Sequence, residues 1–265
     1  MSELVIVRGG GDLASGVIQK FHRSGFRVLV LETEKPSFIR RAVCYGEAIY
    51  EKEVILEGSK AVLVHRIDEI DKVLDGGAIA VIVDPHGNVI KKLKPLAVVD
   101  AILAKRNLGT NLQMAPITVG IGPGFSAGQD VDIAIETMRG HDLGRLIFSG
   151  EAKKNTGIPG IINGYGRERV IYSKVDGVIK NTRKIGDLVE KGEIIALIDN
   201  TEVRSPLTGV LRGLIRDGYQ VPKGFKIGDV DPRRDEQQNC HTISDKARSI
   251  GGSALEAVLY LRRKI

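Results

Sequence analysis

The chain has little of what nucleic-acid-binding proteins rely on. Its 265 residues include no tryptophan, and aromatic residues make up only 5% of them, so stacking platforms for nucleic-acid bases are scarce. No long block of lysine or arginine accompanies the net charge of +6, which is small for a protein with a nucleic-acid partner. We therefore expect no nucleic acid among the partners, whereas a small anionic ligand would suit this charge.

Cysteine and long apolar segments are also scarce. The two cysteines, Cys44 and Cys240, form no CxxC pair and could not build a disulfide framework. No apolar run approaches the roughly 20 residues that a membrane span needs, and no basic segment precedes the N-terminal run LVIV. These absences predict a reduced, soluble, cytoplasmic protein that does not enter a membrane.

The N-terminal part alternates short apolar runs with helical patterns. The runs ELVIV and FRVLVLE predict two buried strands, and LASGVIQKFHRSG between them has apolar residues at helical spacing, which predicts a βαβ unit with parallel strands. AVLVH, AIAVIVD and APITVGIG predict further strands, and residues 93–107 predict a helix with Pro95 near its start. The fold class expected here is α/β with a Rossmann-like parallel sheet, in a nucleotide-binding domain over residues 1–110.

The turn between the first strand and helix carries a candidate phosphate site. Its sequence GGGDLA, starting at Gly9, fits the G-x-G-x-x-G/A pattern, in which a phosphate approaches the second glycine of the pattern and lies at the helix N-terminus. Glu32 ends the second strand, 21 residues after Gly11, where an acidic side chain can accept a hydrogen bond from a ribose. The predicted cofactor-binding residues are Gly9, Gly10, Gly11, Asp12, Ala14, Ser15 and Glu32.

One residue opposes this prediction. The carboxylate of Asp12 would repel a phosphate unless it turned away, for example to cap the helix. The alternative is a glycine turn that serves the fold and binds no ligand.

A second glycine-rich loop and a charged segment follow farther along the chain. GIGPGFSAGQDVD (120–132) leaves a predicted strand, and ETMRGHDLGR (136–145) brings two arginines and a histidine close behind it. Such a combination could clamp a phosphate or a carboxylate. The anion-binding candidates are Gly122, Gly124, Arg139, His141 and Arg145. The alternatives are a loop that turns a corner and surface salt bridges such as Glu136 with Arg139.

The most informative pattern is an internal repeat. Residues 176–199 align with residues 208–231 without a gap, and identical residues such as Gly177 and Gly209 lie 32 positions apart. Each copy has short strand-like runs separated by glycine turns, so we expect the two copies to pair into one pseudo-symmetric β unit. We assign residues 111–235 to a β-rich domain that contains this repeat.

The repeat resembles the biotinyl/lipoyl half-barrel, through the turn IGDLVEKGE and the VRSPLTGV that opens the second copy. The resemblance implies a barrel-sandwich fold for the β-rich domain. Carrier domains of this type hold their cofactor on a lysine between the two halves, but no lysine occurs between Lys191 and Lys223. A carrier function is therefore excluded.

The last segment, residues 236–265, predicts a helical tail that packs back on the core. Ser244 is a candidate N-cap, and apolar residues follow it at helical spacing, with an interruption at Gly251-Gly252. Cys240 and His241 precede this helix, but two neighbouring residues cannot supply a tetrahedral zinc site, so we expect no metal. No Ser-His-Asp order, paired-carboxylate motif or Walker sequence occurs. We assign no catalytic residue, and the role of Cys240 stays open.

The assembled motifs resemble the YqeB family, accessory proteins of the selenium-dependent molybdenum hydroxylase system. The resemblance covers nearly the whole chain and rests on RGGGDLASG, RRAVCYGEAIYE, GIGPGFSAGQDVD, ETMRGHDLGR, NTGIPG, VRSPLTGVL, IGDVDPR and ISDKARSIGGSALEAVL. It implies a role in maturing or equipping a molybdenum hydroxylase, which would be the partner. It also implies a Rossmann-like N-terminal region similar to that of the XdhC chaperones, but no settled reaction.

Three functions are therefore open. The first is an accessory protein that binds a nucleotide, either NAD(P) or a molybdopterin dinucleotide, at the glycine turn. The second is an NAD(P)-dependent oxidoreductase, for which we identify no acid–base residue. The third is a non-enzymatic scaffold that docks the hydroxylase or a sulfur or selenium donor. The sequence does not indicate an oligomeric state.

Overall fold

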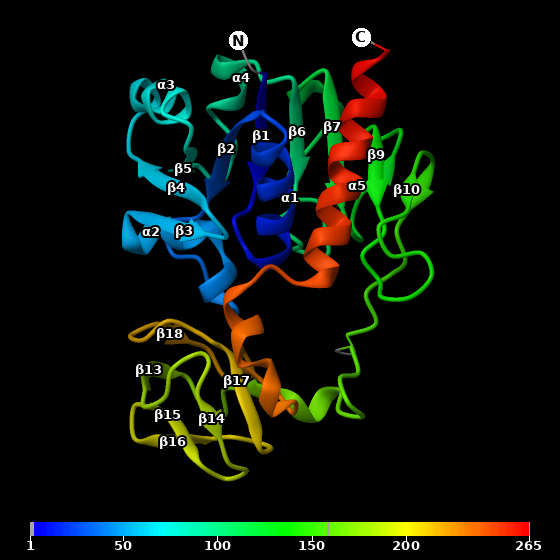
Figure 1. The fold of residues 1–265 in the computed structure, drawn as a ribbon. Helices are drawn as coiled ribbons and strands as arrows, with labels where there is room; N and C mark the ends of the chain where they lie inside the picture. The colour runs from blue at the N-terminus through cyan, green and yellow to red at the C-terminus, as the bar shows by residue number, and fades with distance from the viewer. Residues whose placement is uncertain (1–2, 158–159, 265) are drawn as a thin grey trace. The chain divides into compact units, whose positions relative to one another are not determined.

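Figure 1 shows the fold of the computed structural model, which describes residues 3–157 and 160–264. The described residues divide into two units, called unit 1 and unit 2 below. Unit 1 consists of residues 3–36, 44–155 and 243–264. Unit 2 consists of residues 37–43, 156–157 and 160–242. The chain thus passes between the units four times, and each unit is assembled from separate segments of the sequence.

Unit 1 is built on one large sheet that has nine strands in the described residues. The strands are β1 (Leu4–Arg8), β2 (Arg27–Glu32), β3 (Glu53–Leu56), β4 (Ser59–Val64), β5 (Ile79–Val83), β6 (Ala97–Asp100), β7 (Ile117–Ile121), β9 (Ile133–Ile135) and β10 (Leu146–Ile147). Their order across the sheet is β10-β9-β7-β6-β1-β2-β5-β4-β3. The strands from β9 to β4 in this order are parallel, whereas β3 and β10 run antiparallel at the two edges. Two further short strands, β8 (Ser126–Ala127) and β11 (Gly150–Glu151), pair with each other.

This sheet corrects the fold class expected from the sequence. The expectation of a Rossmann-like parallel sheet is wrong, because the sheet is mixed: β3 folds back on β4, and β10 folds back on β9. The fold is a large mixed sheet with small antiparallel sheets and a C-terminal helix. The division into units also differs from the expected boundary after residue 110, since β7, β9 and β10 complete the same sheet as β1.

Two sequence expectations about single elements are also corrected. Residues 93–107 do not form a helix: they contain the strand β6, which lies between β1 and β7 with all four residues buried. The C-terminal helix is not interrupted at Gly251-Gly252, because α5 runs without a break from Asp245 to Arg262. Its start is as expected, since the Ser244 hydroxyl accepts a hydrogen bond of 3.2 Å from the Ala247 amide.

The helices of unit 1 include two that pack tightly against each other. The five α-helices of the described residues are α1 (Asp12–Arg23), α2 (Ala48–Glu51), α3 (Ile67–Asp75), α4 (Ile90–Leu93) and α5 (Asp245–Arg262). In Figure 1, α1 and α5 lie side by side. A Cβ atom at Gly16 of α1 would lie 2.1 Å from the carbonyl oxygen of Ala247, and one at Gly251 would lie 2.3 Å from the carbonyl oxygen of Gly16.

No helix in the described residues is both long and apolar enough to cross a membrane.

The start of α5 is tied to the β3–β4 hairpin by one carboxylate. Glu57, in the hairpin turn, accepts hydrogen bonds from the Ile243 amide at 2.8 Å and from the Arg248 guanidinium at 2.6 Å. The Gln19 amide of α1 donates a third at 3.3 Å. Burial raises the pKa of Glu57, but these hydrogen bonds outweigh burial, so the pKa lies below its ordinary value.

We expect Glu57→Gln to lower the free energy of unfolding by about 1–3 kcal/mol at pH 7, because hydrogen bonds to an ionised group are the stronger kind. Since the folded-state pKa is lowered, this stabilisation is present above the unfolded-state pKa of about 4.3 and disappears as the pH falls through the folded-state value. Urea unfolding at pH 7 and below pH 4 measures both effects. Glu53→Gln, on the same hairpin but exposed, is the control; an equal loss in both variants would contradict this account.

Unit 2 is built from two small antiparallel sheets. Its strands are β12 (Val170–Tyr172), β13 (Gly177–Asn181), β14 (Leu188–Val189), β15 (Ile194–Ile198), β16 (Thr201–Arg204), β17 (Gly209–Leu214), β18 (Gln220–Val221) and β19 (Lys226–Asp231). One sheet has the order β12-β19-β17-β14 and the other β16-β15-β13-β18. Buried aliphatic side chains such as Ile195, Leu211 and Ile227 form the core.

The internal repeat accounts for this arrangement. The strands β13, β14 and β15 begin 32 residues before β17, β18 and β19, respectively. β14 of the first copy pairs with β17 of the second, and β18 of the second pairs with β13 of the first. Each copy therefore contributes a strand to the sheet of the other, and neither could bury its apolar face alone.

Candidate functional site

The carboxyl ends of the parallel strands form one polar edge of unit 1. Arg8 ends β1, Glu32 ends β2 and Asp100 ends β6, while Glu136 directly follows β9. The strand order reverses at β1, because β2 lies on one side of it and β6 on the other. In open α/β sheets, ligands bind outside the carboxyl ends of the strands near such a reversal. This edge is therefore the candidate site.

The glycine turn lies at this edge, and the chain itself packs closely against it. Gly9 has φ +93°, and a Cβ there would lie 3.0 Å from the carbonyl oxygen of Ala101. A Cβ at Gly10 would lie 2.6 Å from the Cα of Gly46, whose amide donates a 2.9 Å hydrogen bond to the Gly10 carbonyl. Gly11 precedes α1 with φ −73° and ψ −174°, an extended backbone that any residue can adopt. Packing within the chain thus explains Gly9 and Gly10 without a ligand.

The acidic residue predicted to bind a ribose is engaged by the same turn. The Glu32 carboxylate accepts hydrogen bonds from the Gly10 amide at 2.7 Å and from the Thr33 amide at 2.8 Å. Burial raises the pKa of Glu32, although both amides act in the opposite direction. Both carboxylate oxygens therefore already hold the backbone around the turn.

The remaining predicted residues of the turn divide into buried and accessible ones. Ala14 and Ser15 are fully buried, and the Ser15 hydroxyl donates to the Gly11 carbonyl at 2.9 Å and accepts from the Tyr45 amide at 3.0 Å. Gly11 and Asp12 are half-buried. The first turn of α1 is thus the part of the predicted site that a ligand could reach.

The structure adds Lys246, which no pattern in the sequence indicates. It lies in the first turn of α5 and is half-buried. Burial and the nearby Arg139 lower the pKa of Lys246, and the carboxylates of Asp12, Glu136 and Asp245 offset this only in part. The next residue, Ala247, packs against Gly16 of α1, so Lys246 places an ammonium group near the N-terminal half of α1. No local sequence pattern could indicate this, because Asp12 and Lys246 come together only through the packing of α1 on α5.

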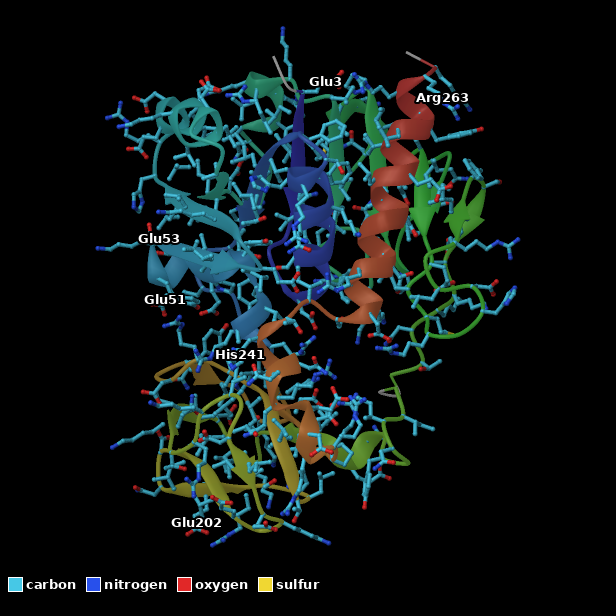
Figure 2. All side chains as sticks on the ribbon, in the orientation of Figure 1. Glu3, Glu51, Glu53, Glu202, His241 and Arg263 are labelled. Atoms are coloured by element: carbon cyan, nitrogen blue, oxygen red, sulfur yellow. The ribbon has the colours of Figure 1, made fainter. Side chains whose placement is uncertain are left out.

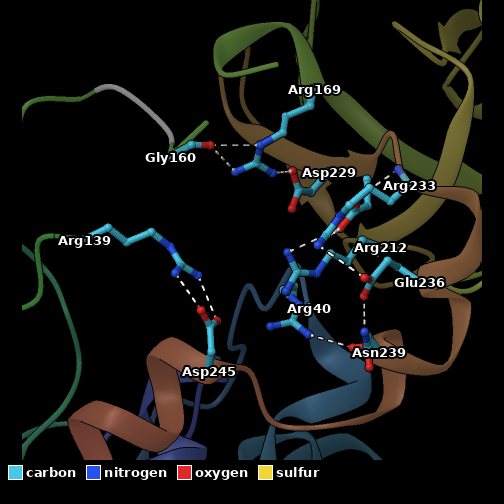
Figure 3. Close-up of polar contacts among 11 residues, drawn as sticks. Arg40, Arg139, Gly160, Arg169, Arg212, Asp229, Arg233, Glu236, Asn239 and Asp245 are labelled. Carbon is cyan, nitrogen blue, oxygen red and sulfur yellow. Dashed lines mark hydrogen bonds and ion pairs between the residues drawn. The ribbon is translucent and has the colours of Figure 1, made fainter. Parts of the chain in front are cut away.

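The second candidate cluster is only partly assembled. Arg139 donates two hydrogen bonds, of 2.8 and 3.0 Å, to the Asp245 carboxylate at the start of α5 (Figure 3). Arg145 pairs with Asp142 at 3.2 Å on the surface, and His141 is exposed. Of the three predicted basic residues, Arg139 is the one whose contacts lead to the neighbourhood of Lys246.

The glycine-rich loop that precedes this cluster is closely packed. The Gly122 amide donates to the Ile135 carbonyl at 2.8 Å, so it already has a partner. A Cβ at Gly124 would lie 2.7 Å from the backbone of Arg106. Glu136 accepts hydrogen bonds from the Met138 and Lys153 amides at 2.7 and 2.8 Å. Packing within the chain thus accounts for these residues without a ligand, and the anion-binding role of Gly122 and Gly124 stays a prediction.

Beneath the glycine turn lies a buried ionic network. Arg8 and Asp100 are each 1% exposed, and the Arg8 guanidinium lies 3.4 Å from the Asp100 carboxylate. The hydroxyl of the buried Thr110 joins the two side chains: it accepts a hydrogen bond from Arg8 and donates one of 2.6 Å to Asp100. Arg8 also donates to the carbonyls of Pro85 at 3.0 Å and Leu108 at 3.4 Å. Burial raises the pKa of Asp100, although Thr110 and Arg8 act against it. This network fixes two loops at the polar edge.

Unit 2 has polar clusters of its own (Figure 3). In one cluster, the buried Arg169 forms an ion pair with Asp229 and donates hydrogen bonds of 3.2 and 3.3 Å to the Gly160 carbonyl. In the other, Arg233 donates hydrogen bonds of 2.7 and 2.9 Å to the Asp231 carboxylate. Cys240 is buried, and burial raises the pKa of its thiol, which is the opposite of an activated nucleophile. The described residues contain no group of acidic, histidine and cysteine side chains that could hold a metal ion.

Two solved structures have a distant likeness to this chain. The product-bound ectoine utilization protein EutE (DoeB) from Ruegeria pomeroyi is 10% identical, with 86% of this chain and 85% of that chain covered and a TM-score of 0.26. An aspartoacylase family protein from Mesorhizobium loti is 8% identical, with 87% and 85% covered and a TM-score of 0.28. At scores this low, the likeness carries no argument about activity.

Comparison at the sequence level gives a much nearer relative. No family model matches the chain. A curated protein of Escherichia coli (strain K12), named "Uncharacterized protein YqeB", is 49% identical over 259 residues, which is 98% of this chain. The match covers 48% of that protein, so the chain spans about half the length of its relative. The match supports the resemblance to the YqeB family over nearly the whole chain, without bearing on the XdhC-like or Rossmann-like details.

Proposed function

We propose that this chain binds a phosphate-bearing ligand at the start of α1, as an accessory protein of selenium-dependent molybdenum hydroxylases. The ligand is a nucleotide or a nucleotide-bearing molybdopterin. The observation that carries the binding proposal is Lys246: a half-buried ammonium group near the first turn of α1, at the edge where the strand order reverses. The accessory role is supported by the sequence resemblance to the YqeB family.

The electrostatics of this place favour an anion in spite of Asp12. The first amides of a helix have no partner within the helix and carry a partial positive charge. The ammonium group of Lys246 and the carboxylate of Asp12 attract each other, so Lys246 counteracts the residue that opposed a phosphate site on sequence grounds. Gly11 has no side chain to cover the first turn, and its backbone conformation does not require glycine. Access for a ligand is a reason for glycine at this position.

The test is a thermal-shift panel with NAD, NADP, ATP, CTP, GTP and extracted molybdopterin on the purified chain. A ligand at 100 times its dissociation constant is expected to stabilise the protein by about 2.7 kcal/mol, a shift of a few degrees. If no compound of the panel raises the melting temperature, the ligand part of the proposal is contradicted and the scaffold role is left. Steady turnover of reduced NAD(P) with a small substrate would instead favour the oxidoreductase.

Two substitutions locate the site once a ligand is found. Lys246→Met is expected to weaken binding roughly tenfold or more, since it removes a charge-assisted contact, and Gly11→Leu is expected to abolish binding by covering the first turn. Titration of each variant with the same nucleotide measures the dissociation constants. Lys72→Met, on the exposed side of α3, is the matched control. Unchanged affinity in both Lys246→Met and Gly11→Leu would place the ligand elsewhere.

A further inference from the structure

The outer face of α5 carries a groove that the proposed function does not use. Its volume is about 710 Å³, and it is lined by Gly252, Leu255, Glu256, Leu259, Tyr260, Arg262 and Arg263. The opposite face of the helix, with Ala247, Ile250 and Ala254, is fully buried. The groove residues recur at helical spacing on one side, so α5 has two different faces, of which only the inner one is covered within unit 1.

The centre of this outer face is apolar and pre-ordered. The side chain of Leu259 is 42% exposed, and that of Phe148 beside the helix is 53% exposed. The ring of Phe148 meets the ring of Tyr260 edge-on, with centroids 5.3 Å apart. The Arg263 guanidinium lies 5.7 Å from the Tyr260 ring centroid and the Lys264 ammonium 4.5 Å from it. Contacts of this kind hold the aromatic side chains in place before any partner arrives.

Two opposite charges flank this apolar centre. Glu256 lies on its N-terminal side. Arg263 lies on its C-terminal side, at the end of α5 (Figure 2). Within the described residues neither side chain has an ion pair, whereas Arg262 pairs with Glu3 at 2.9 Å. Seven residues are about two helical turns, or roughly 10.5 Å, so Glu256 and Arg263 are too far apart to pair with each other along one helix.

We propose that this face binds the same face of a second copy of the chain, with the two α5 helices antiparallel. A two-fold axis between Leu259 and Tyr260 places Glu256 of each copy opposite the partner's Arg263, and brings the two apolar centres together. Symmetric interfaces of this kind are the commonest in homo-oligomers. A uniformly acidic or basic partner fits less well, because it would meet a like charge at Glu256 or at Arg263. One helix face buries little area, so the dimer is expected to be weak, with a micromolar dissociation constant.

Sedimentation equilibrium tests this proposal, with the full chain at concentrations of roughly 1–200 μM in about 0.15 M salt. Salt at that concentration screens the long-range repulsion between two chains of net charge +6. We expect a concentration-dependent dimer. Glu256→Arg and Arg263→Glu should each raise the dissociation constant roughly tenfold or more, because each places like charges together across the axis. The double variant Glu256→Arg/Arg263→Glu should restore it to near the wild-type value.

The control is Lys72→Glu, which changes the net charge as Arg263→Glu does but lies on α3, and it should leave the dissociation constant unchanged. Circular dichroism verifies that each variant is folded. A wild-type chain that stays monomeric over the whole range overturns the proposal. So does a dimer that neither single variant weakens, or a double variant that fails to recover.

Discussion

Gly16→Ala is expected to lower the free energy of unfolding by about 2 kcal/mol or more, although alanine is the better helix former by about 1 kcal/mol. The added Cβ would lie 2.1 Å from the carbonyl oxygen and 2.5 Å from the carbonyl carbon of Ala247. Both atoms are helix backbone and cannot rotate away as a side chain could. The two helices must therefore separate, which opens contacts along their whole length, including that of Gly251 with the Gly16 carbonyl.

The matched control is the same substitution in the neighbouring helix. A Cβ at Gly252 of α5 would meet no atom within 4 Å, so Gly252→Ala is expected to stabilise the fold by about 0.5–1 kcal/mol through helix propensity alone. Urea unfolding of both variants measures the two free energies, and equal m-values would show that the folded and unfolded states are comparable. Stabilisation by Gly16→Ala would contradict the close packing of α1 on α5.

The same packing explains why α5 differs from the interrupted helix that the sequence predicts. Two adjacent glycines in a helical pattern usually weaken a helix, and they predicted an interruption at Gly251-Gly252. The structure keeps the helix continuous because Gly251 lies against the backbone of Gly16, where no larger residue would fit. The partner that makes this glycine favourable is 235 residues away in the chain. A pattern read along one segment contains no information about it.

Strand and helix assignments succeeded where the apolar pattern was unambiguous. The run FRVLVLE predicted a strand that the structure has as β2, and LASGVIQKFHR predicted α1. The spacing in LKPLAVVDAILAKRN predicts a helix, yet this segment contains β6. A short apolar run that is buried on both faces has no period of its own, so helix and strand cannot be told apart by spacing. The expectation of a Rossmann-like parallel sheet is wrong because β3 and β10 fold back at its edges, and such edge strands are too short to leave a clear pattern.

The candidate site shows the same limit at the level of side chains. The sequence indicated the glycine turn and Glu32, and both do lie at the polar edge of the sheet. It could not show that Glu32 bonds the Gly10 amide, or that Gly46 packs against Gly10, because those contacts depend on how the segment around residue 46 folds over the turn. Lys246 was missed for a related reason: lysine is common on surfaces, and only tertiary packing makes this one half-buried.

The second large effect is expected at the buried network below the glycine turn. Asp100→Ala should lower the free energy of unfolding by about 3–5 kcal/mol, because removing one partner of a buried ion pair leaves the other charge uncompensated. Arg8 is 1% exposed, and among residues 3–157 and 160–264 it would keep as partners only the Thr110 hydroxyl and two backbone carbonyls. Asp68→Ala, which breaks the exposed pair with Arg66, is the control and should leave the unfolding midpoint unchanged.

Removing both charges separates the cost of an orphaned charge from the net contribution of the pair. Arg8→Met combined with Asp100→Leu replaces the network by apolar groups of similar size, and this double variant should be more stable than Asp100→Ala, because it leaves no buried charge unpaired. Urea unfolding at pH 7 of the wild type, the two single variants Arg8→Met and Asp100→Leu, and the double variant gives the coupling free energy of the pair. A coupling free energy near zero, or a loss of stability in Asp100→Ala no larger than in Asp68→Ala, would show that Arg8 is solvated in solution.

The same variants report on the site: Asp100 accepts a hydrogen bond of 3.1 Å from the Ile102 amide, and Gly9 packs on residues 101–102. Any nucleotide affinity found at the start of α1 should therefore fall in Asp100→Ala even under conditions where the variant remains folded.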